Sequence, residues 1–90
     1  MLTLPIKKAW FDMVAAGEKL EEYRDISDYY NSRFKNSDTK EILLRNGYCR
    51  FSPTIKVSVK ISQGYGKEIW GAIPNKKYWI LTILKIIKEE

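Results

Sequence analysis

The stretch EILLRNGYCRFSPTIKVSVKI, residues 41–61, gives the clearest indication of a β-sheet in this chain. Its second half alternates apolar and polar residues, the pattern of a strand with one buried face. The apolar set is Ile55, Val57, Val59 and Ile61, and the polar set is Lys56, Ser58 and Lys60. In the first half Asn46-Gly47, a strong hairpin signal, separates residues 41–45 from 48–52. The stretch therefore predicts a hairpin followed by a strand with a basic outer face.

Downstream of this stretch the sequence predicts one more strand. Gly64-Tyr65-Gly66 is typical of a turn, and the glycine and proline within residues 70–75 indicate an ordered loop. Residues 79–87 are apolar on both faces, which suits a strand buried on two sides.

Upstream, the sequence predicts a short strand and two helices. After the strand-like residues 2–4, Pro5 suits the first turn of a helix over residues 5–16 that ends at Gly17. Residues 18–25 are nearly all charged and indicate an extended segment. Ser27-Asp28 is typical of a second helix start, with Ile26, Tyr30 and Phe34 as its predicted buried stripe. Two helices followed by several strands predict an α+β fold with a small curled sheet.

Composition limits the classes of protein to consider. A chain of 90 residues, 44% of them hydrophobic, is one globular domain over residues 1–90. It has no apolar run long enough to cross a membrane and no signal-peptide pattern, so no membrane partner is predicted. With Cys49 as the only cysteine, no intrachain disulfide can form, and a reducing, cytoplasmic location is expected.

Histidine is absent, which excludes Ser-His and Cys-His nucleophile pairs and histidine-ligated zinc. Any catalysis must rest on Lys, Asp, Glu, Tyr, Ser or Thr. Glu21, Glu22 and Asp25 lack a diagnostic metal-ligand spacing. The sequence predicts no cofactor and no metal site.

The net charge of +5 comes entirely from the second half of the chain. Residues 1–45 carry eight basic and eight acidic side chains, whereas residues 46–90 carry eight basic and three acidic ones. The basic residues of the second half are Arg50, Lys56, Lys60, Lys67, Lys76, Lys77, Lys85 and Lys88. This asymmetry favours a polyanionic partner such as nucleic acid; the alternative is a lysine-rich, solvated surface.

The segment GEKLEEYR, residues 17–24, holds the main candidate site. In an extended segment Glu22 and Arg24 share a face and can form an ion pair. Lys19 follows the predicted helix end at Gly17 and can point into the same space. The alternative is a surface ion pair, which contributes at most ~1 kcal/mol.

These four residues, Gly17, Lys19, Glu22 and Arg24, match the G-x-K-x-x-E-x-R signature of ASCH domains, and the chain resembles that family. The preceding LTLPIKKAWFDMV is similar to the strand and helix that lead into the signature. The later EIWGA at residues 68–72, followed by Lys77-Tyr78-Trp79, is similar to a segment of small family members. The resemblance spans almost the whole chain.

The resemblance implies a small PUA-like β-barrel of five or six strands with two short helices, and a ligand cleft beside the first helix. It implies binding of RNA or a nucleotide-like ligand, with Lys19 and Arg24 on a phosphate or base edge. Glu22 would orient Arg24 or accept a hydrogen bond from a base amine. The family also contains amidohydrolases that resemble acetylated-cytidine deacylases, which have a threonine where this chain has Glu22.

The hydrolase alternative therefore lacks its hydroxyl nucleophile. If the chain is an enzyme, a hydrolase or metal-independent ribonuclease, Lys19 with Glu22 or Glu68 is the candidate acid–base pair. A protein-interaction role is a third hypothesis.

Further candidate ligand-binding residues lie outside the signature. Lys7 and Lys8, near the predicted helix start, can form an anion site or extend into solvent. Trp70, close to Lys76, can stack a base for about 1–3 kcal/mol or fill the barrel. Trp10, Trp79 and Phe51 are predicted core residues, and of the adjacent Tyr29 and Tyr30 only one can face inward.

Overall fold

The computed structural model describes residues 1–89, and for residues 88 and 89 the backbone alone. The side chain of Lys88, which the charge analysis counted, lies outside the described residues. In chain order the elements are β1 (Thr3–Ile6), α1 (Lys8–Ala15), β2 (Glu21–Asp25), α2 (Asp28–Phe34), β3 (Thr39–Asn46), β4 (Thr54–Tyr65), the 3₁₀ turn η1 (Glu68–Trp70) and β5 (Lys77–Glu89).

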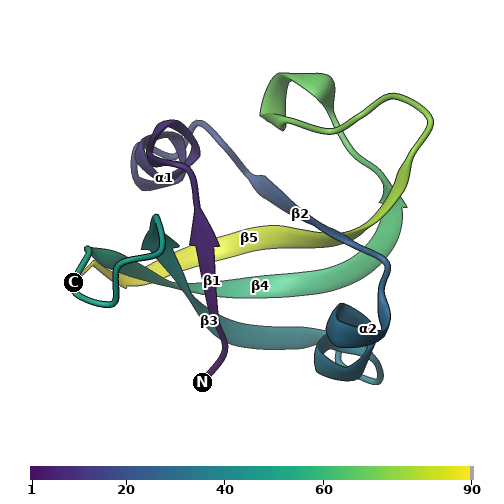
Figure 1. Ribbon diagram of the computed structural model, residues 1–90, viewed down its shortest axis with the longest axis horizontal. Helices are drawn as coiled ribbons and strands as arrows, with labels where there is room; N and C mark the ends of the chain where they lie inside the picture. The colour runs from purple at the N-terminus through teal and green to yellow at the C-terminus, as the bar shows by residue number, and fades with distance from the viewer. Residues whose placement is uncertain (90) are drawn as a thin grey trace.

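The five strands form one curled sheet, a half-barrel, in the order β1-β3-β4-β5-β2. β1 runs parallel to β3, and all other neighbouring pairs are antiparallel. The long strands β4 and β5 bend across the molecule (Figure 1), with register shifts near Val57 and Val59 that increase their twist. The α+β prediction, with a small curled sheet and two short helices, is confirmed.

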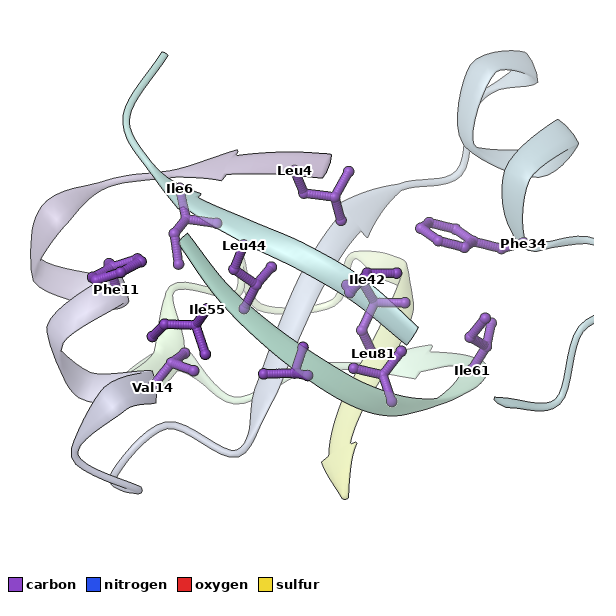
Figure 2. Close-up of a cluster of buried hydrophobic side chains, with 12 residues drawn as sticks. Leu4, Ile6, Phe11, Val14, Phe34, Ile42, Leu44, Ile55, Ile61 and Leu81 are labelled. Carbon is purple, nitrogen blue, oxygen red and sulfur yellow. The ribbon is translucent and has the colours of Figure 1, made fainter. Parts of the chain in front are cut away.

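The core fills the concave side of the sheet (Figure 2). The predicted alternation in β4 is confirmed, because its four apolar residues are at most 7% exposed while Lys60 is exposed. Phe11 and Val14 of α1 cover one end of this core and Phe34 of α2 the other. The remaining buried members of the cluster are Leu4, Ile6, Ile42, Leu44 and Leu81.

The first helix begins later than the sequence predicts, because Pro5 lies inside β1 and α1 begins at Lys8. Parallel pairing sets Pro5 opposite Arg45 of β3. β1 is an edge strand, and the imide nitrogen of Pro5 faces its open side, where no hydrogen-bond donor is required. Tertiary pairing of the strand therefore overrides the helix-start preference of proline.

The predicted hairpin exists, but its loop is longer than two residues. β3 ends at Asn46, whose N–H donates to Pro53 O at 3.0 Å, and β4 begins at Thr54. Residues 48–52 are not a strand, because a turn closed by Ser52 N–H to Cys49 O (2.9 Å) occupies them. The assignment of Phe51 to the core is wrong: its side chain is 83% exposed.

Three smaller expectations also differ from the structure. Residues 64–66 are not a turn, because β4 continues through Tyr65, which pairs with Lys77. Residues 79–87 are buried only in part, since β5 extends beyond β2 and leaves Leu84 55% exposed. Ile26 lies before α2 and is 41% exposed, whereas Phe34 and Tyr30 pack inward as expected.

In the described part of the chain no helix has the length and apolar character of a membrane span.

Candidate functional site

The two edge strands of the half-barrel are joined by a side chain rather than by a ladder of backbone bonds. Arg24 of β2 donates from Nη2 to the carbonyl oxygen of Pro5 in β1 at 2.7 Å. Its Nη1 also donates to the hydroxyl of Tyr30 in α2 at 3.2 Å. Arg24 therefore fixes the position of β1 relative to β2 and α2, and the candidate site lies along this seam.

Glu22 connects Arg24 to Lys19. Its Oε2 accepts from Arg24 Nη2 at 2.8 Å, and its Oε1 lies 3.4 Å from Lys19 Nζ. The ion pair between Glu22 and Arg24 is thus confirmed, and it is buried rather than solvated, because Glu22 is only 8% exposed. Each carboxylate oxygen has more than one lone pair, so Glu22 retains acceptor capacity for a further donor.

Lys19 lies beneath the site, with 1% of its surface exposed. Its Nζ donates to Glu21 O at 2.6 Å and to Trp70 O at 3.0 Å, in addition to its contact with Glu22. The ammonium also lies 5.1 Å from the centroid of the Trp10 ring. Burial lowers the pKa of Lys19 below its usual range, and the Glu22 carboxylate opposes that shift. With three oxygen contacts, Lys19 has no free proton to offer a ligand.

The local sequence explains how a lysine reaches this depth. α1 ends at Ala15 with Ala16 as its C-cap, and Gly17 adopts φ +77°, the left-handed conformation that reverses the chain after a helix. The amides of Glu18 and Lys19 then both donate to Met13 O, at 2.8 and 3.1 Å. This turn directs Lys19 back under α1, and β2 begins two residues later.

Above Glu22 and Arg24 lies a cleft of about 210 Å³. Its lining residues are Ile6, Lys7, Trp10, Glu22, Tyr23, Arg24, Trp70, Gly71 and Tyr78. Four of these nine are aromatic, and Lys7, Glu22 and Arg24 supply charged groups. Lys19, Glu22 and Arg24 sum to one positive charge, and Lys7 adds a second, exposed one. The cleft therefore combines aromatic walls with a cationic base and rim.

The segment after β4 forms one wall of this cleft because several contacts fix it there. The amide of Lys67 donates to Tyr23 Oη at 2.9 Å, and Trp70 Nε1 donates to Glu18 O at 3.1 Å. Gly71 adopts φ +97°, and a Cβ there would lie 3.1 Å from the Trp10 ring. The wall is thus attached both to β2 and to the end of α1.

The structure brings together four of the predicted ligand-binding residues, Lys7, Glu22, Arg24 and Trp70, in the lining of one cleft. Lys19 lies directly below it, and Gly17 shapes the chain without lining it. Trp70 is neither fully exposed nor a core plug: the residue is half-buried, and the ammonium of Lys67 lies 4.9 Å from the centroid of its ring.

The other three predicted residues lie outside the cleft lining. Lys8 is exposed and forms an ion pair with Asp12 at 2.6 Å. Lys76 pairs with Asp25 at 2.9 Å. Glu68 is exposed in η1, so it does not share the cleft with Glu22.

Sequence reasoning missed the remaining aromatic residues of the cleft. Trp10 was assigned to the core alone, yet it also faces the cleft, and Tyr23 and Tyr78 were not singled out. Because side chains alternate along β2, Tyr23 and Glu22 point to opposite faces of the sheet. β2 is an edge strand with one open side, so a cleft at that side can contact both residues. The one sequence feature that indicated an aromatic wall was Tyr23, the aromatic residue inside the charged segment 18–25.

A second hollow, of about 560 Å³ and wide open, lies between α2 and the sheet. It contains none of the predicted site residues. Its lining is Asp28, Asn31, Ser32, Lys35, Gln63 and Trp79, and the Trp79 indole donates to Asn31 Oδ1 at 2.8 Å. Among the side chains that the structure describes, no cluster of acidic or cysteine residues has the arrangement of a metal site.

Comparison of the chain with protein-family models, curated proteins and solved structures finds no match.

Tyr23 provides a spectroscopic test of this geometry. Burial raises the pKa of Tyr23 well above its usual value of 10, and its hydrogen bond to Glu21 Oε1 (2.6 Å) adds to the shift. Of the six tyrosines, one should therefore ionise last in a tyrosinate absorbance titration, and Tyr23→Phe should remove that phase. Because the unfolded chain loses this proton first, Tyr23 makes the free energy of unfolding fall as pH rises past 10. If Tyr23→Phe leaves the last phase unchanged, the assignment is wrong.

Proposed function

We propose that this protein binds single-stranded RNA and holds one nucleotide in the cleft between α1, β2 and the η1 segment. The observation that carries the proposal is the combination in one cleft of aromatic walls, a buried Glu22–Arg24 pair and the exposed Lys7.

The size of the cleft suits one base rather than a longer segment. A volume of about 210 Å³ equals about seven water molecules at about 30 Å³ each, which is room for a planar ring with its substituents. Proteins that select RNA by sequence commonly stack an unpaired base on aromatic side chains and read its hydrogen-bonding edge. Trp10, Tyr23 and Trp70 offer the aromatic surface here.

The polar groups have matching roles in this proposal. Glu22 accepts from a base N–H, because each of its oxygens keeps a free lone pair beside its bond to Lys19 or Arg24. Lys7, at the rim, contacts a phosphate. The basic side chains of the second half, such as Lys60 and Lys67, attract the rest of the strand. Lys19 acts as a positioning residue that holds Glu22 and the η1 segment.

The same residues carry the resemblance to ASCH domains, and we propose that the chain is a small member of that family. Glu22 and Arg24 of the G-x-K-x-x-E-x-R segment line the cleft, with Lys19 below them. Trp70 and Gly71 of the EIWGA segment form its opposite wall. Two sequence segments about fifty residues apart thus contribute to one site, as expected if both serve a single ligand.

Adjacent lysines allow a matched test. Lys7→Glu should weaken binding of single-stranded RNA about tenfold, because it replaces a phosphate contact with repulsion. Lys8→Glu makes the same charge change one residue away, outside the cleft, and should have a smaller effect. Fluorescence anisotropy at low and moderate salt measures both variants, and affinity should fall as salt rises.

Two results would contradict the proposal: negligible affinity for every RNA at low salt, or equal losses in the two variants. Equal losses would indicate attraction by net charge alone.

A hydrolase acting on a modified nucleoside is the second candidate function, because Lys19 Nζ lies 3.4 Å from Glu22 and burial lowers the pKa of the lysine. This function requires Lys19 to exchange one of its three oxygen contacts for a contact with the substrate. Incubation with nucleosides that include acetylated cytidine, followed by mass spectrometry, distinguishes the two. Conversion that Lys19→Met abolishes while the fold persists would favour the enzyme, whereas binding without conversion favours the RNA-binding module.

A further inference from the structure

The loop between β3 and β4, residues 47–53, has a defined shape. Ser52 N–H donates to Cys49 O at 2.9 Å, which makes Arg50 and Phe51 the two central residues of a turn. The N–H of Asn46 donates to Pro53 O at 3.0 Å and closes the base of the loop. The loop therefore presents its tip in a preferred conformation, with two anchored ends.

The tip carries two large aromatic side chains that contact solvent. Tyr48 is 91% and Phe51 83% exposed, and the Arg50 guanidinium lies 4.9 Å from the centroid of the Phe51 ring. Most other aromatic side chains of this domain pack against its core or line the cleft. Exposed rings on an ordered turn are suited to stacking against a flat partner, and an arginine beside a ring adds a second planar, cationic surface.

The base of the loop contacts β1, whose last residue lines the cleft. Gly47 N–H donates to Ile6 O at 2.8 Å, and Ile6 and the next residue, Lys7, line the cleft. Figure 1 shows the loop beside the end of β1, below α1, on the opposite side of the molecule from α2. The base of the loop is thus bonded to Ile6, a residue that also lines the cleft.

The charge around the tip favours an anionic partner. No acidic residue lies between Glu41 and Glu68 in the sequence, so the whole loop and β4 carry only basic and neutral side chains. Lys56 of β4 forms a distant ion pair with Glu41 at 3.5 Å, and Arg50 has its contact with Phe51. A polyanion thus meets no acidic side chain on the loop itself.

We propose that Tyr48, Arg50 and Phe51 form a second stacking platform, which binds bases of the same single-stranded nucleic acid next to the nucleotide in the cleft. This inference rests on the proposed function and extends it from one nucleotide to a continuous strand. Stacking on exposed rings accepts any base. The cleft therefore selects the nucleotide, and the tip adds affinity and fixes the direction in which the strand runs. A ligand that fills only the cleft does not use the platform.

The test compares two RNA ligands and two variants. The ligands are a mononucleotide and an oligonucleotide of about ten nucleotides, within the site sizes typical of small single-strand-binding domains. The double variant Tyr48→Ser/Phe51→Ser removes the platform, and Tyr29→Ser is its control. Tyr29 is also half-exposed next to an arginine, Arg33, but lies on α2. Because the replaced rings are exposed, both variants should keep the wild-type melting temperature.

We expect the double variant to weaken oligonucleotide binding about tenfold or more and to leave mononucleotide binding unchanged. Tyr29→Ser should leave both unchanged. Unchanged oligonucleotide binding in the double variant would overturn the platform while the cleft function stands. Oligonucleotide binding that depends on the tip but not on Lys7 would instead overturn the cleft function. If the double variant changes only the sedimentation of the protein with anionic vesicles, the tip is a membrane contact and the inference fails.

Discussion

Replacement of Lys19 by methionine should lower the free energy of unfolding by about 3–5 kcal/mol, the range for breaking a buried ion pair. Glu22 would keep only Arg24, and the carbonyl oxygens of Glu21 and Trp70 would lose their buried donor. A loss of this size is a large part of the stability of a small domain, which is about 5–15 kcal/mol in total. Urea unfolding followed by tryptophan fluorescence measures it.

Lys8→Met is the matched control for this change. Lys8 also pairs with a carboxylate, Asp12, but at the surface, where such a pair contributes at most ~1 kcal/mol. The two variants make the same chemical change at sites that differ in burial and in the number of oxygen contacts of the ammonium. If the two variants lower the midpoint of urea unfolding equally, the buried ammonium of Lys19 does not stabilise the site.

Gly66→Ala should lower the free energy of unfolding by about 1–3 kcal/mol, the usual range for overpacking. A Cβ on Gly66 would lie 2.6 Å from Cζ of Tyr23 and 2.8 Å from Cβ of Ala72, closer than van der Waals contact allows. The Tyr23 ring would have to move, and with it one wall of the cleft. We therefore expect Gly66→Ala both to lower the melting temperature and to shift the late tyrosine ionisation toward pH 10.

Gly64→Ala, two residues earlier in β4, is the control. Its Cβ would meet only the end of the flexible Ile80 side chain, at 3.3 Å, and its backbone is ordinary extended chain. Replacement of glycine at a compatible site contributes up to about 1 kcal/mol by restricting the unfolded chain. The alanine at 64 should therefore be close to neutral. An equal loss in both variants would mean that the contact with Tyr23 is not the cause.

Much of the fold follows from local patterns. The alternation of Ile55 to Ile61 and the cap at Ser27, whose hydroxyl accepts from Tyr30 N–H at 3.3 Å, were both visible in the sequence. The same holds for the pairing of Glu22 with Arg24, because residues two apart on a strand share a face. These features depend only on neighbours along the chain.

Features that depend on distant partners were predicted less well. Pro5 looks like a helix start until β1 is known to pair with β3 at an edge of the sheet. The local sequence of residues 48–52 is compatible with a strand, but the structure forms a turn there, closed by the hydrogen bond from Ser52 N–H to Cys49 O. In each case a tertiary or loop hydrogen bond decided between two conformations that the local sequence allows.

The sequence by itself therefore determined an α+β domain with a curled sheet, a basic second half and a Glu22–Arg24 pair. Only the tertiary structure decided that Lys19 is buried beneath the site, that Trp70 closes the cleft, and that Lys7 but not Lys8 faces it. The physical reason is distance along the chain. Lys19 and Trp70 are joined by a hydrogen bond across 51 positions, and no periodicity or propensity reports such a contact before the sheet has formed.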